Sequence, residues 1–161
     1  MLFSGYLAWW INKFEPGTEK MINIYQAIRE GANAYLKRQT KTITLISIIL
    51  AVILYLIFDM GNQSYGGLPL TAASFLIGAS LSLLAGYVGM DVATRANSRV
   101  TYAARDGVEG PLHIAFRGGL VMGLFNVGLS LLAVTGLFYL FPIISGESLA
   151  RAPELIVGLG F

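Results

Sequence analysis

The chain has 161 residues, of which 55% are hydrophobic and only 12% are charged. Globular domains carry about 25% charged residues, so this deficit, together with three long apolar runs, excludes an ordinary soluble domain and indicates a multi-span membrane protein. The formal net charge of +2 is too small to indicate nucleic-acid binding, and the absence of cysteine excludes disulfides and thiolate metal sites.

The first predicted element, residues 1–12, is apolar and aromatic and ends near Trp9 and Trp10. Eleven helical residues rise only about 16 Å, roughly half of a bilayer core. Tryptophans followed by Lys13 are typical of a membrane interface at the end of a span. We therefore expect the last half of a transmembrane helix whose beginning is missing. A short interfacial anchor is the alternative.

A turn is predicted from Glu15 to Thr18, with Thr18 as the N-cap of a long helix. Apolar residues then recur at spacings of three and four, which indicates an amphipathic helix. No proline follows until Pro69, so the helix can continue into the membrane. Residues 13–42 are therefore predicted as a cytoplasmic loop and helix, and residues 43–59 as the first full span.

A polar, glycine-rich turn is predicted from Asp59 to Leu68, with Asp59 solvated at the non-cytoplasmic end of the span. Pro69 then begins the next helix, because an early helical position needs no backbone donor. Residues 70–90 would rise about 31 Å as a helix, close to the ~30 Å of a bilayer core. They are the second predicted span.

Residues 91–117 form a polar connection after the second span. We expect this connection to be helical as far as about Arg105. It then turns at two glycine-containing pairs, Asp106-Gly107 and Gly110-Pro111.

Residues 118–141 are the third predicted span, which ends before Pro142. Residues 142–161 are predicted as a non-cytoplasmic loop followed by the start of another helix at Leu155. The expected fold class is thus all-α, a polytopic bundle of transmembrane helices.

Lysine and arginine are distributed unevenly among the connections. There are six in residues 13–42, none in 59–69, four in 91–117 and one after residue 141. Cytoplasmic loops carry the excess of basic residues, so the first and third of these segments are predicted to face the cytoplasm. The basic anchors expected in the second cytoplasmic segment are Arg95, Arg99, Arg105 and Arg117.

Small residues repeat every four positions on two predicted spans. Such patterns allow helix backbones to approach closely in lipid, although glycine is also generally enriched in membrane helices. We favour a packing role because two adjacent spans show the pattern. The predicted packing residues are Gly78, Ser82 and Gly86 in one span and Gly119 and Gly123 in the other.

Asp91, Arg95 and Arg99 share a helix face at four-residue spacing. The guanidinium groups of two arginines could bind phosphate. We favour the interpretation that these residues form a basic membrane anchor with an internal ion pair. Asp106, Glu109 and His113 lie close together in the sequence and could be drawn as a metal site. We favour the simpler interpretation that these are polar residues of a turn and its flank.

The central parts of the predicted spans contain no acidic, lysine or arginine residue. Ionisable groups within a membrane mark ion and proton pathways, so we predict no conduction path in this chain alone. There is also no phosphate-binding loop, zinc spacing or nucleophile elbow. No catalytic, cofactor-binding or metal-ligating residue is therefore predicted.

Four strings of the sequence carry a family resemblance, and they are IREGANAYLKRQTKTI at 28–43, SFLIGASLSLLAGYVGM at 74–90, ATRANSRVTYAAR at 93–105 and IAFRGGLVMG at 114–123. In this order, and over nearly the whole chain, they resemble the membrane-bound, ion-pumping inorganic pyrophosphatases. One departure is Thr40, where an aromatic residue is expected.

The resemblance implies an N-terminal fragment of a homodimeric pump with about sixteen helices in two concentric rings. Such a pump hydrolyses cytosolic pyrophosphate with Mg²⁺, sometimes with K⁺ or Na⁺, and translocates protons or sodium. The family's acidic substrate-binding string would follow Phe161, so this chain would supply outer-ring packing helices and be inactive alone. Its expected surroundings are the lipid bilayer of a prokaryotic cell and the remaining pump helices. The alternative is a stand-alone small membrane protein that acts as a helix-packing partner.

Overall fold

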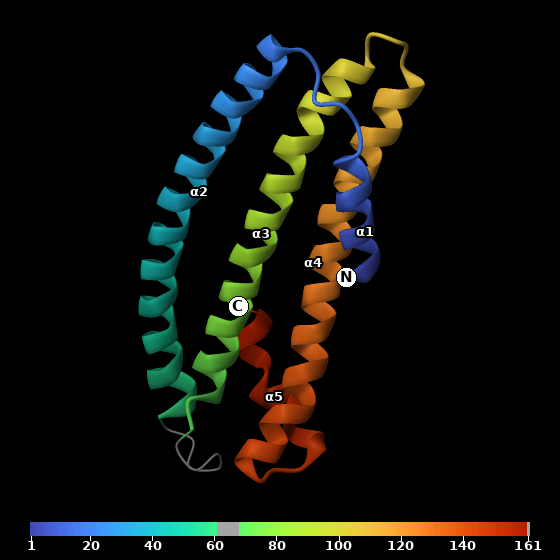
Figure 1. Cartoon of the computed structure of the whole chain (residues 1–161). Helices are drawn as coiled ribbons and strands as arrows, with labels where there is room; N and C mark the ends of the chain where they lie inside the picture. Colours follow the sequence, from blue (N-terminus) through green and yellow to red (C-terminus); the bar gives the residue numbers. More distant parts are fainter. Residues whose placement is uncertain (61–67, 161) are drawn as a thin grey trace. The chain divides into compact units, whose positions relative to one another are not determined.

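The computed structural model describes residues 1–60 and 68–160, and these residues form helices joined by short connections (Figure 1). No strand occurs within these two ranges, which confirms the predicted all-α class. The main helices are α1 (Leu2–Ile11), α2 (Glu19–Leu54), α3 (Leu70–Ala103) and α4 (Glu109–Ser145), and a π-helical turn (Tyr55–Asp59) extends α2.

The internal contacts divide the chain into two compact units. Unit 1 contains Met1–Gln39 and Leu84–Gly128, and unit 2 contains Thr40–Leu83 and Leu129–Phe161. The three long helices contribute residues to both units, whereas α1 belongs to unit 1 alone.

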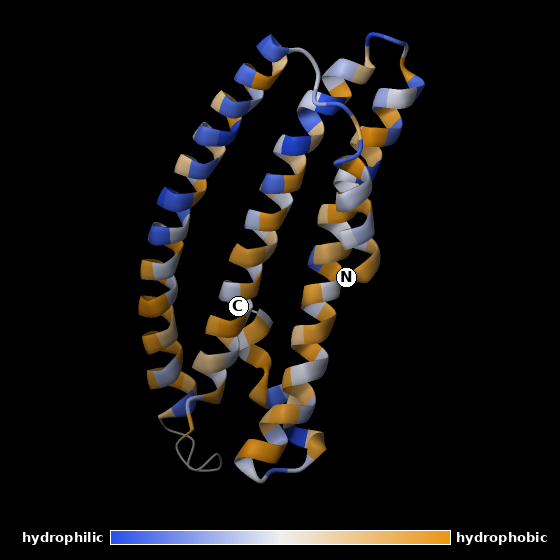
Figure 2. Cartoon of the chain, viewed as in Figure 1, coloured by the Kyte–Doolittle hydropathy of each residue, from blue (hydrophilic) through white to orange (hydrophobic). Residues whose placement is uncertain are grey.

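Helix α2 begins directly after Thr18, as the sequence predicts. The backbone N–H of Ile22 donates to the Thr18 carbonyl at 3.0 Å, and Glu19 lies in the first turn, where the helix dipole favours an acid. Figure 2 shows that the helix is largely hydrophilic in its first half and hydrophobic in its second half. One continuous helix therefore contains both the predicted polar segment and the first apolar run.

The connection between α3 and α4 differs slightly from its prediction. Gly107 has a φ of +128°, which L side chains rarely adopt, and this supports the predicted turn at Asp106-Gly107. The second predicted turn is wrong, because α4 already begins at Glu109. Pro111 is tolerated there since the first turn of a helix has no intrahelical use for its N–H.

Helix α4 also continues past Pro142, where we expected its end. It extends to Ser145, whose hydroxyl donates to the Phe141 carbonyl at 2.9 Å. A proline removes one backbone donor from the helix, and here it does so only in the last turn.

Asp59 is buried, with 2% of its surface exposed, so the prediction that it is solvated was wrong. Its Oδ1 accepts from the backbone N–H of Thr71, and its Oδ2 accepts from that of Ala72, both at 3.1 Å. Helix α3 begins here, and its first N–H groups have no partner within the helix. The carboxylate satisfies two of them and matches the positive end of the helix dipole. Most of the predicted polar turn lies in residues 61–67, outside the described residues.

The core of unit 1 joins α1 to α3 and α4. Leu7 and Ile11 of α1 are buried with Val92 and Ala96 of α3 and with Val121 of α4. Lipid tails are as apolar as these side chains, so close packing, more than removal from water, favours this contact in a membrane.

Unit 2 has two apolar clusters. One joins Leu70 of α3, Leu137 and Phe141 of α4, and Leu155 near the end of the chain. The other joins Ala51 of α2 to two residues of α3, Ala72 and Phe75.

The residues after Ser145 form short turns, where we expected a loop and then a helix from Leu155. They are a 3-10 turn (Leu149–Arg151), α5 (Ala152–Leu155) and a second 3-10 turn (Val157–Gly160). Gly158 and Gly160 lower the helical propensity of the last segment. Gly158 also lies directly against α3, where an added Cβ atom would collide with the Thr71 carbonyl oxygen.

Three helices are long and apolar enough to cross a membrane, and they are Glu19–Asp59, Leu70–Ala103 and Glu109–Ser145. At most 22% of the residues in the most apolar window of each helix are buried. The rest of this apolar surface needs lipid or other helices as its neighbour, because contiguous exposed apolar area on this scale is not stable in water.

Candidate functional site

The Asp91 carboxylate is the centre of a polar cluster in unit 1. Its Oδ2 lies 2.7 Å from Nη2 of Arg95, one turn further along α3, and its Oδ1 lies 3.0 Å from Nη2 of Arg29 on α2. Nη1 of Arg29 also donates to the Tyr25 hydroxyl at 3.3 Å. The predicted internal ion pair is thus confirmed, and a second arginine extends it from α3 to α2.

Arg99 connects α3 to the segment between α1 and α2. Its Nε donates to the Phe14 carbonyl at 3.1 Å, and its Nη1 donates to the Arg95 carbonyl at 2.7 Å. Arg95 itself has a buried Nε with no partner among the described residues. Arg29, Arg95 and Arg99 each bind an acceptor of the protein itself, which favours the structural interpretation over phosphate binding.

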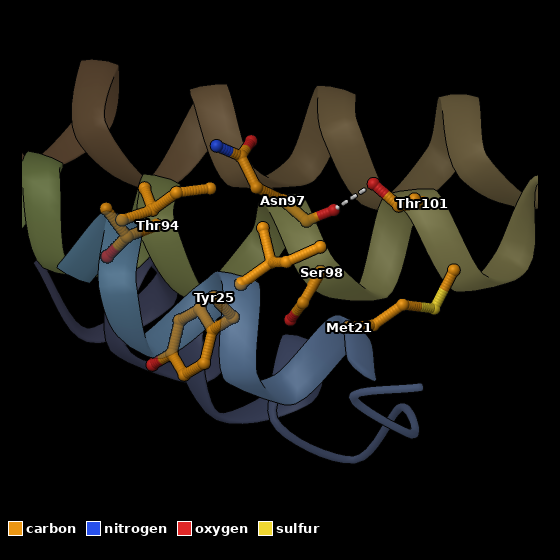
Figure 3. A pocket seen from close by; sticks show the side chains of 8 residues that line it. Met21, Tyr25, Thr94, Asn97, Ser98 and Thr101 are labelled. Atoms are coloured by element: carbon orange, nitrogen blue, oxygen red, sulfur yellow. Dashed lines mark hydrogen bonds between the residues drawn. The ribbon is translucent and has the colours of Figure 1, made fainter. Parts of the chain in front are cut away.

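An open pocket of about 110 Å³ lies between α2 and α3 in unit 1 (Figure 3). Among residues 1–60 and 68–160, no charged side chain lines it. The hydroxyl of Thr101 donates to the Asn97 carbonyl at 2.9 Å, and the hydroxyl of Thr94 donates to the Met90 carbonyl at the same distance. The polar part of the lining consists of neutral hydroxyl and amide groups. Its lining residues are Met21, Ile24, Tyr25 and Ile28 from α2, and Thr94, Asn97, Ser98 and Thr101 from α3.

The other two predicted basic anchors lie over aromatic rings. The guanidinium carbon of Arg105 is 5.6 Å from the centre of the Tyr102 ring, and that of Arg117 is 3.9 Å from the centre of the Trp10 ring. Arg117 is thereby placed beside α1, a contact that the sequence spacing does not reveal. The cytoplasmic location of all four arginines remains a prediction.

Two of the predicted packing residues lie beside the C-terminal segment in unit 2. A Cβ on Gly78 would lie 3.1 Å from Cδ2 of Leu159, so the backbone is closely covered there. Ser82 lines a pocket of about 360 Å³ together with Gly78 and Gly158.

The other three predicted packing residues, Gly86, Gly119 and Gly123, are more open. A Cβ added to any of them would meet no atom of another segment within 4 Å in the described parts of the chain. In unit 1, α3 and α4 approach at different glycines. A Cβ on Gly89 would lie 2.8 Å from Cγ of Met122, and one on Gly118 would lie 3.3 Å from the Ala96 Cβ. The packing role of all five predicted residues remains a prediction.

The candidate metal group is not assembled. Nε2 of His113 lies 4.0 Å from Oε1 of Glu109, and both side chains are largely exposed. Within residues 1–60 and 68–160, no three acidic or histidine side chains gather in a way that could hold a metal ion.

These contacts and the three membrane-capable helices define the chain as a helical, integral, multi-pass membrane protein. In unit 1, Asp91 of α3 binds Arg29 of α2, and Arg99 of α3 binds the linker before α2.

A family model described as inorganic H⁺ pyrophosphatase matches residues 1–161, so the chain belongs to this family. A "K(+)-insensitive pyrophosphate-energized proton pump 2" of Moorella thermoacetica is 44% identical over 161 residues, which is 100% of this chain. A similarly named pump of Pyrobaculum aerophilum is 41% identical over 99% of the chain, and "Pyrophosphate-energized membrane proton pump 3" of Arabidopsis thaliana is 35% identical over 99%.

The chain spans 22% of the length of each of these three relatives. No solved structure matches the chain significantly.

Proposed function

We propose that this chain supplies the N-terminal packing helices of a membrane pump that couples pyrophosphate hydrolysis to proton translocation. The observation that carries the proposal is the family match over the whole chain. The names of the relatives favour protons over sodium as the transported ion, and several describe the pump as insensitive to K⁺. We extend both properties to the pump that contains this chain.

Within that pump the role proposed for this chain is structural. No three acidic or histidine side chains gather among its described residues, and we assign the binding of Mg²⁺ and pyrophosphate to other segments of the pump. The Asp91 cluster and the Arg99 contact would hold the polar part of α2 and the linker before it on α3. The apolar surfaces that remain exposed would face lipid, the other pump helices and the second subunit of a homodimer.

A chimera tests this function. The segment of the Moorella thermoacetica pump that matches this chain is replaced by residues 1–161, and Mg²⁺-dependent pyrophosphate hydrolysis and dye-monitored acidification are measured in inverted membrane vesicles. We expect the chimera to hydrolyse pyrophosphate and acidify the vesicles, because matching helices would restore the packing around the catalytic helices. We expect no hydrolysis from residues 1–161 alone.

The controls are the relative with this segment deleted and the unaltered relative, all compared at equal amounts in the membrane. A chimera that inserts at the level of the unaltered pump but shows neither activity would contradict the proposal and favour a stand-alone packing partner. Hydrolysis by residues 1–161 alone would contradict the purely structural role.

A further inference from the structure

One face of α1 carries a row of exposed aromatic rings. Phe3, Tyr6 and Trp9 follow one another at three-residue spacing, with ring centres 6.3 Å and 5.9 Å apart. Each is more than half exposed, whereas Leu7 and Ile11 of the same helix are buried. An apolar aromatic surface of this kind is stable beside lipid, and tryptophan concentrates at the level of the headgroups.

Two cations lie over the two adjacent tryptophans at the end of this face. The Nζ atom of Lys13 is 3.7 Å from the centre of the Trp9 ring, and the guanidinium carbon of Arg117 is 3.9 Å from that of Trp10. Trp10 is further held by Phe14, with ring centres 4.5 Å apart in an edge-to-face arrangement. All of these residues belong to unit 1.

Neither cation is neutralised within the described residues. No ion pair joins Lys13 or Arg117 to an acid there, although Glu15 is only two positions from Lys13 in the sequence. A ring engages one face of a cation and leaves N–H donors free to bind an anion. The two pairs thus present positive charge at the depth where the tryptophans are expected to meet the headgroups.

We propose that the two cation–tryptophan pairs, Lys13 with Trp9 and Arg117 with Trp10, bind the phosphate groups of anionic phospholipids in the adjacent leaflet. Charge complementarity selects an anionic headgroup, because a basic residue near an anionic membrane surface contributes about 1 kcal/mol. The aromatic row requires an acyl chain beside it, which a free phosphate ion in solution cannot supply. The site is independent of the pump function proposed above.

Intrinsic fluorescence tests the proposal, because Trp9 and Trp10 are the only tryptophans in the sequence. The chain is reconstituted in phosphatidylcholine vesicles that contain an equal small fraction of either brominated phosphatidylglycerol or brominated phosphatidylcholine. We expect the anionic lipid to quench more strongly, and we expect added salt to reduce this preference by screening. Lys13→Gln and Arg117→Gln should each lower the preference by up to about five-fold.

The matched control is Lys41→Gln, which removes the same charge elsewhere and should keep the preference. Lys13→Arg and Arg117→Lys should keep it too, which separates loss of charge from loss of folding. Equal quenching of the wild type by both lipids would overturn the proposal, as would a preference that survives in the double glutamine variant. Quenching by neither lipid would show that protein covers this face, which would also overturn it. The proposal would also be overturned if inorganic phosphate abolished the preference and chloride of equal ionic strength did not, because the two pairs would then bind free phosphate.

Discussion

Asp59→Ala is expected to destabilise unit 2 by about 2–4 kcal/mol, because it leaves the backbone N–H groups of Thr71 and Ala72 without their acceptor. A buried donor that loses its partner costs about 1–3 kcal/mol, and loss of a side-chain cap at a helix start costs about 0.5–2 kcal/mol. The measurement is equilibrium unfolding in mixed micelles with increasing sodium dodecyl sulfate, followed by the helical circular dichroism signal.

Asp59→Asn should lie between alanine and wild type, since one carboxamide oxygen can still accept from one of the two donors. The matched control is Asp106→Ala, at an exposed acid in the turn before α4, which should unfold like the wild type. If Asp59→Ala and Asp106→Ala both unfold at the same fraction of sodium dodecyl sulfate as the wild type, the Asp59 carboxylate does not cap α3.

Gly158→Ala is the second substitution with a large expected effect. An added Cβ would collide with the Thr71 carbonyl oxygen and the Ser74 hydroxyl, and would lie 3.0 Å from the Phe75 nitrogen. Two of these three atoms are backbone, and the hydroxyl already donates to the Thr71 carbonyl at 2.9 Å. None of them can move without disturbing the first turns of α3. Overpacking of this kind costs about 1–3 kcal/mol or more.

The control for this substitution is Gly160→Ala, two residues further on, where no atom of the described residues lies within 4 Å of the added Cβ. The same unfolding measurement should show a lower midpoint for Gly158→Ala and little change for Gly160→Ala. Equal midpoints for the two variants would mean that the segment Val157–Gly160 does not pack against α3.

Both substitutions act on the first turns of α3. Asp59 binds the N–H of Thr71 from the end of α2, and Gly158 lies against the carbonyl of the same residue. The end of α2, the start of α3 and the segment Val157–Gly160 thus meet at Thr71. Asp59→Ala and Gly158→Ala are therefore expected to be non-additive, because residues that share a partner couple energetically.

The long helices and their apolar parts could be predicted from the sequence, because hydropathy is a local property, whereas Pro111 and Pro142 did not mark the ends of α4. Thr18 and Glu19 marked the start of α2, and the four-residue spacing of Asp91 and Arg95 predicted their ion pair. In each case the partners lie within one turn of a helix, where the geometry is fixed by the backbone.

The contacts between segments could not be predicted in this way. Arg29 binds Asp91 from 62 positions away, and no local pattern distinguishes it from other basic residues of α2. The burial of Asp59 depends on which N–H groups lie beside it once the chain has turned back. The small-residue repeats indicated that helices pack closely, but the tightest glycine contact in the described residues is at Gly158, outside those repeats.

The most direct test asks whether α4 crosses the membrane and whether the basic segments lie on the cytoplasmic side. The chain has no cysteine, so single cysteines can be placed at Asp106, before the helix, and at Ser148, after it. Both positions are exposed. A membrane-impermeant maleimide is applied to right-side-out and inverted vesicles. We predict that the cysteine at 106 reacts only in inverted vesicles and the cysteine at 148 only in right-side-out vesicles. Labelling of both from the same side would contradict the account.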